Sequence, residues 1–482
     1  MLRGNKQALH SRYNPQGEAE RYINTLALNS GIRFFILIEP GLGYLIPPLR
    51  KKNNTARIIA LYAEDSGKEI PAANCPDSFW SPGSGLSLQD FLECEIPDTG
   101  AGDIKIVEWR PSLGVYGEDY LRLLSETAEF IKRSDANTRT VRQFGPRWFK
   151  NFFRNLALLS EALCPVSLKN PLAVTGAGPG LEETIPFIKE EQRRGGLLVL
   201  AVSSSALALL SGGVEPDLVI AVDGGGWALL HLYECLRHRK TKNIFAVSLT
   251  AAVPSQCGAF PILPLSDGSL WQELILKAFG IPFIPLPQRG TVSASALDLA
   301  FCLTEGKIFL TGLDLSHKDM RTHVRPYSFD RLWEEKACRV NPLYSQVYSR
   351  SLGISDGGSH GIYASWFGNQ LKAYPKRLYS LGSNNPVFGG LETLPVRDHP
   401  GKGESTGKEK PVFKTLSIQP RDNPAEQGAL ILKEALRNPL YTEKLICELG
   451  PLLFPPETPL SPEELGKKIL SLACPGKEDP NG

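Results

Sequence analysis

Short runs of consecutive apolar residues recur through the middle of the chain, and amphipathic helical patterns separate several of them. Five runs read PLAVTG, LLVLAV, DLVIAVD, NIFAVSL and KIFLTGLD, at residues 171–176, 197–202, 217–223, 243–249 and 307–314. Their Val, Ile and Leu residues do not alternate with polar ones, which is typical of strands buried on both faces of a sheet. Between the first two runs, Leu181, Ile185 and Ile188 share one helical face, and Glu190 with Arg194 forms an exposed i, i+4 pair. This alternation predicts an α/β domain with a doubly wound parallel sheet.

The N-terminal part of the chain shows a similar but less complete pattern. Segment 33–49 predicts a strand and a GLG turn, and segment 56–65 predicts a second strand that ends in Glu64 and Asp65. A strand, a GxG turn and an acidic residue about 20 residues later are features of Rossmann-like domains. The third glycine of that pattern is missing, and a diproline weakens the helix that should follow. A structural role of this turn is therefore favoured over ligand binding. The chain continues with a predicted strand and then a helical stretch, at 103–111 and 117–163.

The character of the sequence changes after Pro395. Residues 397–411 are polar and rich in Gly and Lys, which predicts a linker, and two short amphipathic helices should follow it. Ser461 is expected to cap the second helix, with Pro462 at its first position. A linker of this kind would let the tail move to engage a partner. The predicted parts are a Rossmann-like N-terminal domain with a helical linker, a central α/β domain, and a linker with a small helical tail, at 1–165, 166–396 and 397–482.

Composition narrows the class of protein. The chain has 482 residues, 42% hydrophobic and 22% charged, which is ordinary for a globular protein of two or three domains. A net charge of +2 provides no overall basic field for nucleic acid or a membrane surface. The nine cysteines form no CxxC pair, so reduced thiols are expected rather than a zinc ribbon or a disulfide framework. The first residues contain no apolar signal segment, and no apolar stretch is long enough to span a bilayer, so we expect a cytoplasmic protein.

Glycines and polar residues follow several predicted strands directly. In GAGPG, Gly176 and Gly178 lie at a strand-to-helix turn, where glycine permits close approach of a ligand and free N–H groups favour an anion. A tight turn without a ligand explains the same residues equally well. Comparable positions at strand ends or helix starts are held by Ser203, Ser204, Ser205, Asp223, Thr291, Ser293, Gly312 and Asp314. Each has a structural explanation as a cap or an Asx-turn. Because ligands bind outside the carboxyl ends of the strands in open α/β sheets, their joint placement predicts a ligand site.

Several of these segments resemble the motility accessory factor glycosyltransferases. The matching segments are LHSRYNPQGEAERYI, the GLGY turn, GAGPGLEETIPFIKE, VEPDLVIAVDGG and GTVSASALDLAFCLTEGKIFLTGLDLSH, which lie within residues 9–65 and 171–395. The central domain of that family is shared with the archaeal 6-hydroxymethylpterin pyrophosphokinases and is similar in fold to bacterial sialyltransferases. The resemblance implies transfer of a nonulosonic acid from a CMP-activated donor to Ser or Thr of flagellin or another protein acceptor.

The resemblance also implies roles for single residues. By motif position, the nucleotide would be contacted by Gly176, Gly178, Ser203, Ser204, Asp223, Thr291 and Ser293. Gly312 and Asp314 match a G-x-D turn near the ribose or phosphate, and Asp314 is also a catalytic candidate. No resident metal is implied for this reaction.

A base can take the proton of the acceptor hydroxyl in such a transfer. His317, His323 and His360 follow the last clear strand, although a surface loop histidine is the more ordinary interpretation of each one. His360 is the first candidate because its SDGGSHG context suggests an exposed loop, and His317 is the second.

Aromatic and basic residues nearby have open interpretations. Tyr327 and Tyr363 could hydrogen-bond the leaving phosphate, but packing is the more ordinary role of both. Arg321 and Arg325 could bind an anionic sugar or phosphate, or could be solvated surface charges.

Two other functions remain open at this point. The first is transfer of pyrophosphate from ATP to a hydroxymethylpterin, which needs Mg²⁺ and would use Asp223 and Asp314 as metal ligands. The extra N-terminal domain and tail argue against it. The second is a non-catalytic nucleotide-binding scaffold.

Overall fold

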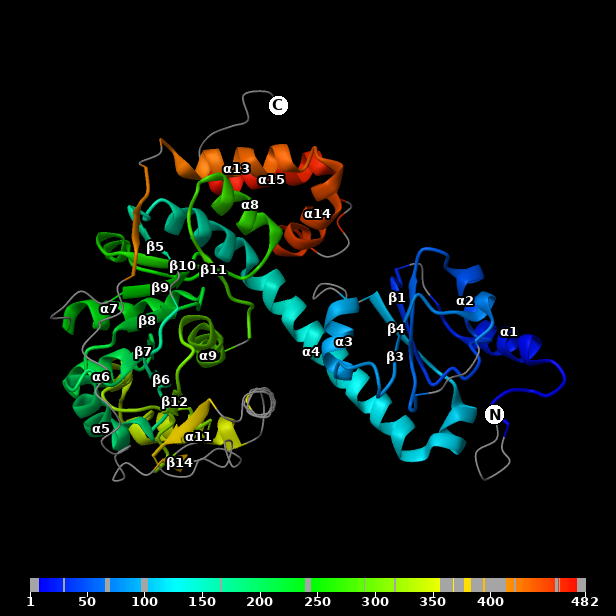
Figure 1. The fold of residues 1–482 in the computed structure, drawn as a ribbon, viewed down its shortest axis with the longest axis horizontal. Coiled ribbons are helices and arrows are strands. Elements are labelled where there is room, and N and C mark those ends of the chain that lie inside the picture. Colours follow the sequence, from blue (N-terminus) through cyan, green and yellow to red (C-terminus); the bar gives the residue numbers. More distant parts are fainter. Residues whose placement is uncertain are drawn as a thin grey trace. The chain divides into compact units, whose positions relative to one another are not determined.

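The chain separates into two compact units in this computed structural model (Figure 1). They are Met1–Gln143 with Phe454–Pro456, and Phe144–Leu453 with Glu457–Gly482. The division lies inside helix α4 (Arg110–Leu156), not near residue 165 as the sequence suggested. The reason is that the last turns of this long helix pack within the second unit, where Phe152 contacts Trp271. The structure describes residues 8–28, 31–65, 70–96, 103–164, 167–238, 244–289, 291–315, 318–355, 367, 377–382, 393–394, 413–419, 422–455, 458 and 460–474.

The first unit contains a four-stranded parallel sheet in the order β3-β2-β1-β4. The strands are β1 (Phe34–Ile38), β2 (Arg57–Leu61), β3 (Ser78–Trp80) and β4 (Ile104–Glu108). Its helices are α1 (Pro15–Thr25), α2 (Ile46–Lys52), η1 (Ala72–Asn74) and α3 (Leu88–Glu95). Helix α2 does form after the glycine turn, because proline is tolerated in the first turn of a helix. The expected parallel α/β arrangement of this unit is therefore present.

Protein atoms occupy the space beside the two glycines of the GLGY turn in the first unit. Gly41 and Gly43 both have positive φ, +61° and +73°. A Cβ on Gly41 would lie 2.6 Å from His10 Nε2, and one on Gly43 would lie 2.3 Å from the carbonyl oxygen of Asn74. The His10 ring itself stacks on Trp109, with centroids 5.3 Å apart. These contacts account for both glycines by backbone geometry and close packing.

The second unit is built on a larger sheet in the order β14-β13-β12-β6-β7-β8-β9-β10-β5-β15, with β11 beside β10. All pairs are parallel except the antiparallel pair of β15 and β5. The five predicted strands are confirmed as β6 (Leu172–Thr175), β7 (Leu198–Val202), β8 (Leu218–Ala221), β9 (Ile244–Ser248) and β12 (Ile308–Thr311). The others are β5 (Glu161–Leu163), β10 (Ile262–Ser266), β11 (Ile284–Pro285), β13 (Leu378–Leu381), β14 (Thr393–Leu394) and β15 (Thr415–Ser417).

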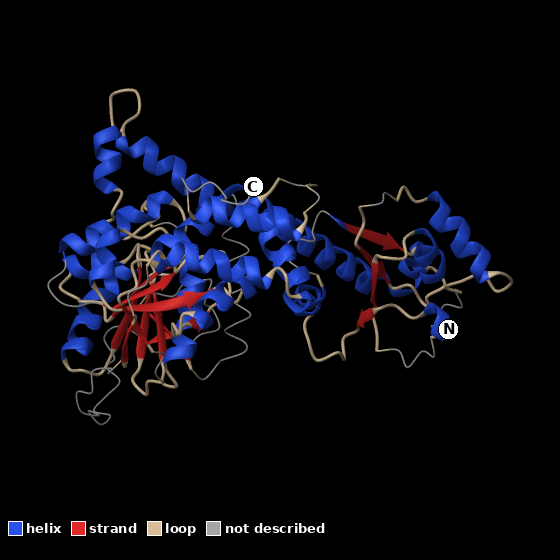
Figure 2. Cartoon of the chain, turned by 90° about the horizontal axis from the view of Figure 1, so that it is seen from above, coloured by secondary structure: helices blue, strands red, loops and turns tan. Residues whose placement is uncertain are grey.

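Helices surround this sheet, as Figure 2 shows. They are α5 (Leu181–Arg193), α6 (Ala206–Ser211), η3 (Gly226–Ala228), α7 (Leu229–His238), η4 (Ser255–Ala259), α8 (Leu270–Ala278), α9 (Val292–Leu303), α10 (Asp330–Lys336) and α11 (Leu343–Ser355). Helix α9 packs against β6, β7 and β8. Strand β6 lies between β12 and β7, so the strand order reverses beside β6, which is where open α/β sheets bind ligands.

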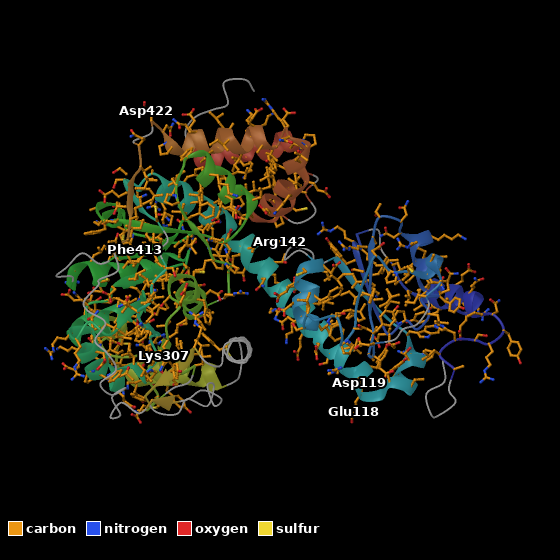
Figure 3. The ribbon with its side chains drawn as sticks, in the orientation of Figure 1. Glu118, Asp119, Arg142, Lys307, Phe413 and Asp422 are labelled. Atoms are coloured by element: carbon orange, nitrogen blue, oxygen red, sulfur yellow. The ribbon has the colours of Figure 1, made fainter. Side chains whose placement is uncertain are left out.

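The C-terminal helices belong to the second unit. They are α13 (Pro424–Ala435), α14 (Pro439–Leu453) and α15 (Pro462–Ala473), and α15 carries the expected capping box of Ser461 and Glu464. Helix α13 packs on α8 and α15, and Phe413, before β15, is buried in the core of the sheet (Figure 3). The hypothesis of a mobile tail is therefore corrected, because α13 and α14 pack against α8 of the same unit. The predicted linker 397–411 lies outside the described residues.

No helix among the described residues is long and apolar enough to cross a membrane.

Candidate functional site

The polar strand ends that the sequence singled out lie along one edge of the larger sheet. Strands β12, β6, β7 and β8 are parallel neighbours, so their carboxyl ends meet at the same edge. That edge carries the GAGPG loop after β6, Ser203 and Ser204 after β7, Asp223 after β8, and Gly312 with Asp314 after β12. The structure therefore brings these segments together beside the switch point at β6.

The GAGPG loop is held by the loop that follows β12. The N–H of Gly176 donates to the Thr311 carbonyl at 2.8 Å, and that of Gly178 donates to the Gly312 carbonyl at 2.7 Å. The N–H of Gly180 donates to Asp314 Oδ2 at 3.0 Å. The GAGPG loop lies so close to the loop after β12 that this packing alone accounts for the presence of glycine, without a ligand.

Asp314 supplies an anion at the start of α5. Burial raises the pKa of its carboxyl group, although the Gly180 N–H acts in the opposite direction. A carboxylate near a helix N-terminus is favoured by the helix dipole and by N–H groups that lack a partner in the helix. This position of Asp314 was not foreseen from the sequence.

The serine cluster and the Asp223 loop differ in exposure. Ser205 Oγ donates to the carbonyl oxygens of Thr175 and Val202, both at 2.9 Å, so this residue fastens the strand end. Ser203 is buried and Ser204 is half-buried. Asp223 is exposed, and its Oδ1 accepts the N–H of Gly225 at 2.7 Å in an Asx-turn.

Two buried asparagines of α4 hold the loops after β8 and β9. Asn151 Nδ2 donates to the carbonyls of Gly224 and Thr250 at 3.3 and 3.1 Å. Asn155 Nδ2 donates to the carbonyls of Leu249 and Ala251, both at 2.8 Å. Sequence reasoning missed this support, although two Asn at i, i+4 within the apolar run WFKNFFRNL are a signal of buried polar contacts.

Thr291 begins α9 as its N-cap. Its Oγ1 accepts the N–H of Ser293 at 3.3 Å, so the structural explanation of Thr291 applies. Gly290, which precedes it, lies outside the described residues.

Residues 318–336, which we call the covering segment, follow β12 and contact both α5 and α7. At one end, Val324 donates its N–H to the carbonyl of Ala177 in the GAGPG loop at 2.8 Å. Arg321 forms an ion pair with Glu182 of α5 at 2.8 Å, and Lys318 pairs with Glu183. The segment thus contacts the GAGPG loop directly.

An aromatic cluster joins the covering segment to α7. Tyr327 is buried at its centre and stacks on His323, with centroids 4.2 Å apart. His231 of α7 contacts Tyr327 and Phe329 at centroid distances of 5.3 and 5.1 Å. Burial, and then repulsion from His323, lower the pKa of His231 to about 4. The packing interpretation of Tyr327 agrees with this arrangement.

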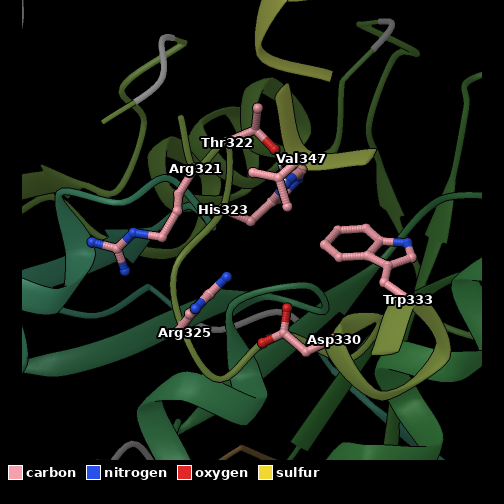
Figure 4. Close-up of a pocket in the computed structure, with 7 residues that line it drawn as sticks. All are labelled: Arg321, Thr322, His323, Arg325, Asp330, Trp333 and Val347. Atoms are coloured by element: carbon pink, nitrogen blue, oxygen red, sulfur yellow. Dashed lines mark hydrogen bonds between the residues drawn. The ribbon is translucent and has the colours of Figure 1, made fainter. Parts of the chain in front are cut away.

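A hollow opens on the covering segment (Figure 4). It is lined by Arg321, Thr322, His323, Arg325, Asp330, Trp333 and, from α11, Val347. Asp330 Oδ2 accepts the N–H of Tyr327 at 2.9 Å. The lining of the hollow therefore includes a guanidinium (Arg325), a carboxylate (Asp330) and an indole ring (Trp333).

Three residues of the sequence analysis lie outside the described residues. They are His317, His360 and Tyr363, so the proposed order of bases stays a prediction. His323 is the one of the three histidine candidates that the structure describes.

Asp223 and Asp314, the pair expected to hold Mg²⁺ in pyrophosphate transfer, follow strands that are not neighbours in the sheet. They follow β8 and β12, which are separated by β6 and β7. Three strand spacings are about 14 Å. Within the described ranges there is also no group of three or more His, Cys, Asp or Glu side chains arranged to hold a metal ion. The Asp223 and Asp314 pair expected for pyrophosphate transfer stays a prediction.

Three comparisons with known proteins show what this chain is similar to. Residues 147–320 match the family model described as 6-hydroxymethylpterin diphosphokinase MptE-like. An uncharacterized protein of Treponema pallidum (strain Nichols) is 27% identical over 313 residues, which are 65% of this chain and 67% of that protein. The solved structure of the MAf glycosyltransferase from Magnetospirillum magneticum AMB-1 aligns with 98% of this chain and 84% of its own, at 12% identity and a TM-score of 0.49. The family model confirms the resemblance for the central domain.

Proposed function

We propose that this chain, whose residues 147–320 match the MptE-like family model, is a glycosyltransferase of the cytoplasm. It transfers a nonulosonic, sialic-acid-like sugar from a CMP-activated donor to a Ser or Thr hydroxyl of flagellin. The observation that supports this most is the meeting of the matching motifs at one edge of the sheet, on both sides of the switch point at β6.

The proposed transfer requires few catalytic groups from the protein. The bond between the anomeric carbon and the phosphate oxygen breaks, and CMP leaves with the electron pair. The acceptor oxygen bonds to the sugar carbon and loses its proton to a base. Stabilisation of the departing phosphate and of an oxocarbenium-like sugar supplies most of the remaining catalysis.

Each motif residue has a proposed part in this reaction. Ser203, Ser204, Asp223, Thr291 and Ser293 contact the nucleotide together with the backbone at Gly176, Gly178 and Gly312. His360, or else His317, accepts the proton. Asp314 is proposed to support catalysis through the GAGPG loop that its carboxylate holds.

The test is a calorimetric titration of the protein with CMP and, separately, with ATP and Mg²⁺. We expect saturable CMP binding that Asp223→Ala removes, because Asp223 is exposed at the edge of the sheet. Asp119→Ala, which removes an exposed carboxylate of the other unit, is the matched control. Transfer itself is measured as a mass increase of flagellin incubated with the protein and CMP-N-acetylneuraminate.

The description of the matching family favours one second candidate, pyrophosphate transfer to a hydroxymethylpterin. Tighter binding of ATP with Mg²⁺ than of CMP would support that reaction. Binding of neither nucleotide at about 1 mM, an affinity weaker than about −4 kcal/mol, would indicate a non-catalytic scaffold.

A further inference from the structure

The covering segment contains two arginines near the hollow, and their environments differ. Arg321 Nη1 forms an ion pair with Glu182 Oε1 at 2.8 Å, and its side chain points away from the hollow in Figure 4. Arg325 uses only its backbone N–H on the same Glu182 oxygen, at 2.9 Å. No carboxylate among the described residues lies within ion-pairing distance of the Arg325 guanidinium, which lines the hollow.

The backbone that presents Arg325 is fixed on both sides. The preceding residue, Val324, is bonded to the Ala177 carbonyl of the GAGPG loop. Two residues later, Tyr327 packs against His231, on the helix that follows the Asp223 loop. Arg325 thus lies in a segment that contacts both the GAGPG loop after β6 and the helix that follows the Asp223 loop.

We propose that Arg325 binds the carboxylate of the donor's sugar and that the hollow forms one wall of the subsite of that sugar. This inference rests on the proposed function. A guanidinium binds a carboxylate through two parallel hydrogen bonds, which are stronger than bonds between neutral groups.

The other side chains of the hollow match the rest of such a sugar. Trp333 presents an aromatic face for the apolar C–H groups of a ring, and Asp330 offers carboxylate oxygens to hydroxyl or amide donors. Ligand sites generally combine an apolar surface with a few polar groups that fix orientation. A neutral sugar would leave Arg325 without its partner, so the subsite selects for an acidic sugar.

The test compares three ligands by calorimetry: CMP, CMP-N-acetylneuraminate, and the methyl ester of the latter, which lacks the charged carboxylate. The wild-type protein should bind the acid about 10- to 100-fold more tightly than the ester. Arg325→Ala should abolish this difference and leave CMP affinity unchanged, which also shows that the variant is folded. Arg325→Lys should retain part of the difference, because it keeps the charge but not the planar fork.

Arg331→Ala is the matched control, because Arg331 is an exposed arginine of the same segment that pairs with Glu335 outside the hollow. It should behave as wild type with all three ligands. Equal affinity of the wild-type protein for the acid and the ester, or a preference for the acid that survives in Arg325→Ala, would overturn the inference. CMP binding in the same experiment would still support the proposed function. Failure of the wild-type protein to bind CMP would overturn both.

Discussion

The carboxylate of Asp314 accepts the N–H of Gly180 at 3.0 Å, just before the first turn of α5. In nucleotide-binding α/β folds, this place is the usual position of a phosphate group. Here a side chain from the loop after β12 supplies the negative charge. A nucleotide at this edge must therefore bind beside the Asp314 carboxylate or displace it.

Gly178→Ala should destabilise the protein strongly, because the alanine Cβ would lie 1.9 Å from Asp314 Oδ2 and 2.8 Å from the Gly312 carbonyl oxygen. Overpacking of this kind costs about 1–3 kcal/mol or more in the free energy of unfolding. Gly226→Ala is the control, since nothing lies within 4 Å of its added Cβ, and it should change stability by less than about 0.5 kcal/mol. Urea unfolding measures both, and equal effects would contradict the close packing of the GAGPG loop.

His231 should make stability depend on pH. Its pKa is lowered to about 4 from the ordinary 6.5 by burial and by His323. The unfolded chain then binds the proton more readily, so stability is complete above pH 6.5 and falls as the pH drops toward 4. At pH 5 the loss from this group is about 2 kcal/mol.

His231→Phe keeps the ring contacts with Tyr327 and Phe329 and removes the titrating group. The Nδ1 atom that it deletes is buried and has no hydrogen-bond partner among the described residues. Urea unfolding at pH 7.5 and pH 5 should show a smaller loss in the variant than in the wild type. An identical pH dependence of the two proteins would assign the acid sensitivity to other groups.

The buried strands were predictable because their short apolar runs, rich in Val, Ile and Leu, do not alternate, which is typical of a sheet covered on both faces. Strand β10 was missed because Pro264 stands inside it, and proline normally argues against a strand interior. The capping box at Ser461 was readable because all of its atoms lie within one turn.

The long-range parts of the site could not be predicted in the same way. GAGPG shows that a backbone must come close to something, but not that the partner is Asp314, 134 residues away from Gly180. Likewise, the sequence pattern of α4 indicates a long helix. It does not show at which residue the helix passes from the first unit to the second. Arg321 and Arg325 look alike in the sequence. They differ in the structure because Glu182 pairs with the guanidinium of Arg321 but only with the backbone N–H of Arg325.

Asn155→Ala should lower the free energy of unfolding by about 2–4 kcal/mol, because the buried carbonyls of Leu249 and Ala251 both lose their donor. Lys150 on the same helix is exposed, so Lys150→Ala is the control and should be nearly neutral.

Asn151→Ala removes the donor to the Gly224 carbonyl, so it should also weaken CMP binding by loosening the loop that carries Asp223. Calorimetry and urea unfolding separate the two effects, and full CMP affinity in Asn151→Ala would show that the loop holds its shape without α4.

The C-terminal helices α13 and α14 pack against α8. Glu448 of α14 accepts the N–H groups of Leu270 and Trp271 at 3.1 and 3.2 Å, and so caps α8 from another part of the chain. Glu448→Ala should lower the free energy of unfolding by about 1–2 kcal/mol, and Glu448→Gln by less, because its amide oxygen still accepts one bond. A chain that ends at residue 421 should fail to fold stably, since it leaves the α8 face under α13 and α14 without cover. A thermal unfolding curve unchanged by that truncation would show instead that these helices are a separate appendage.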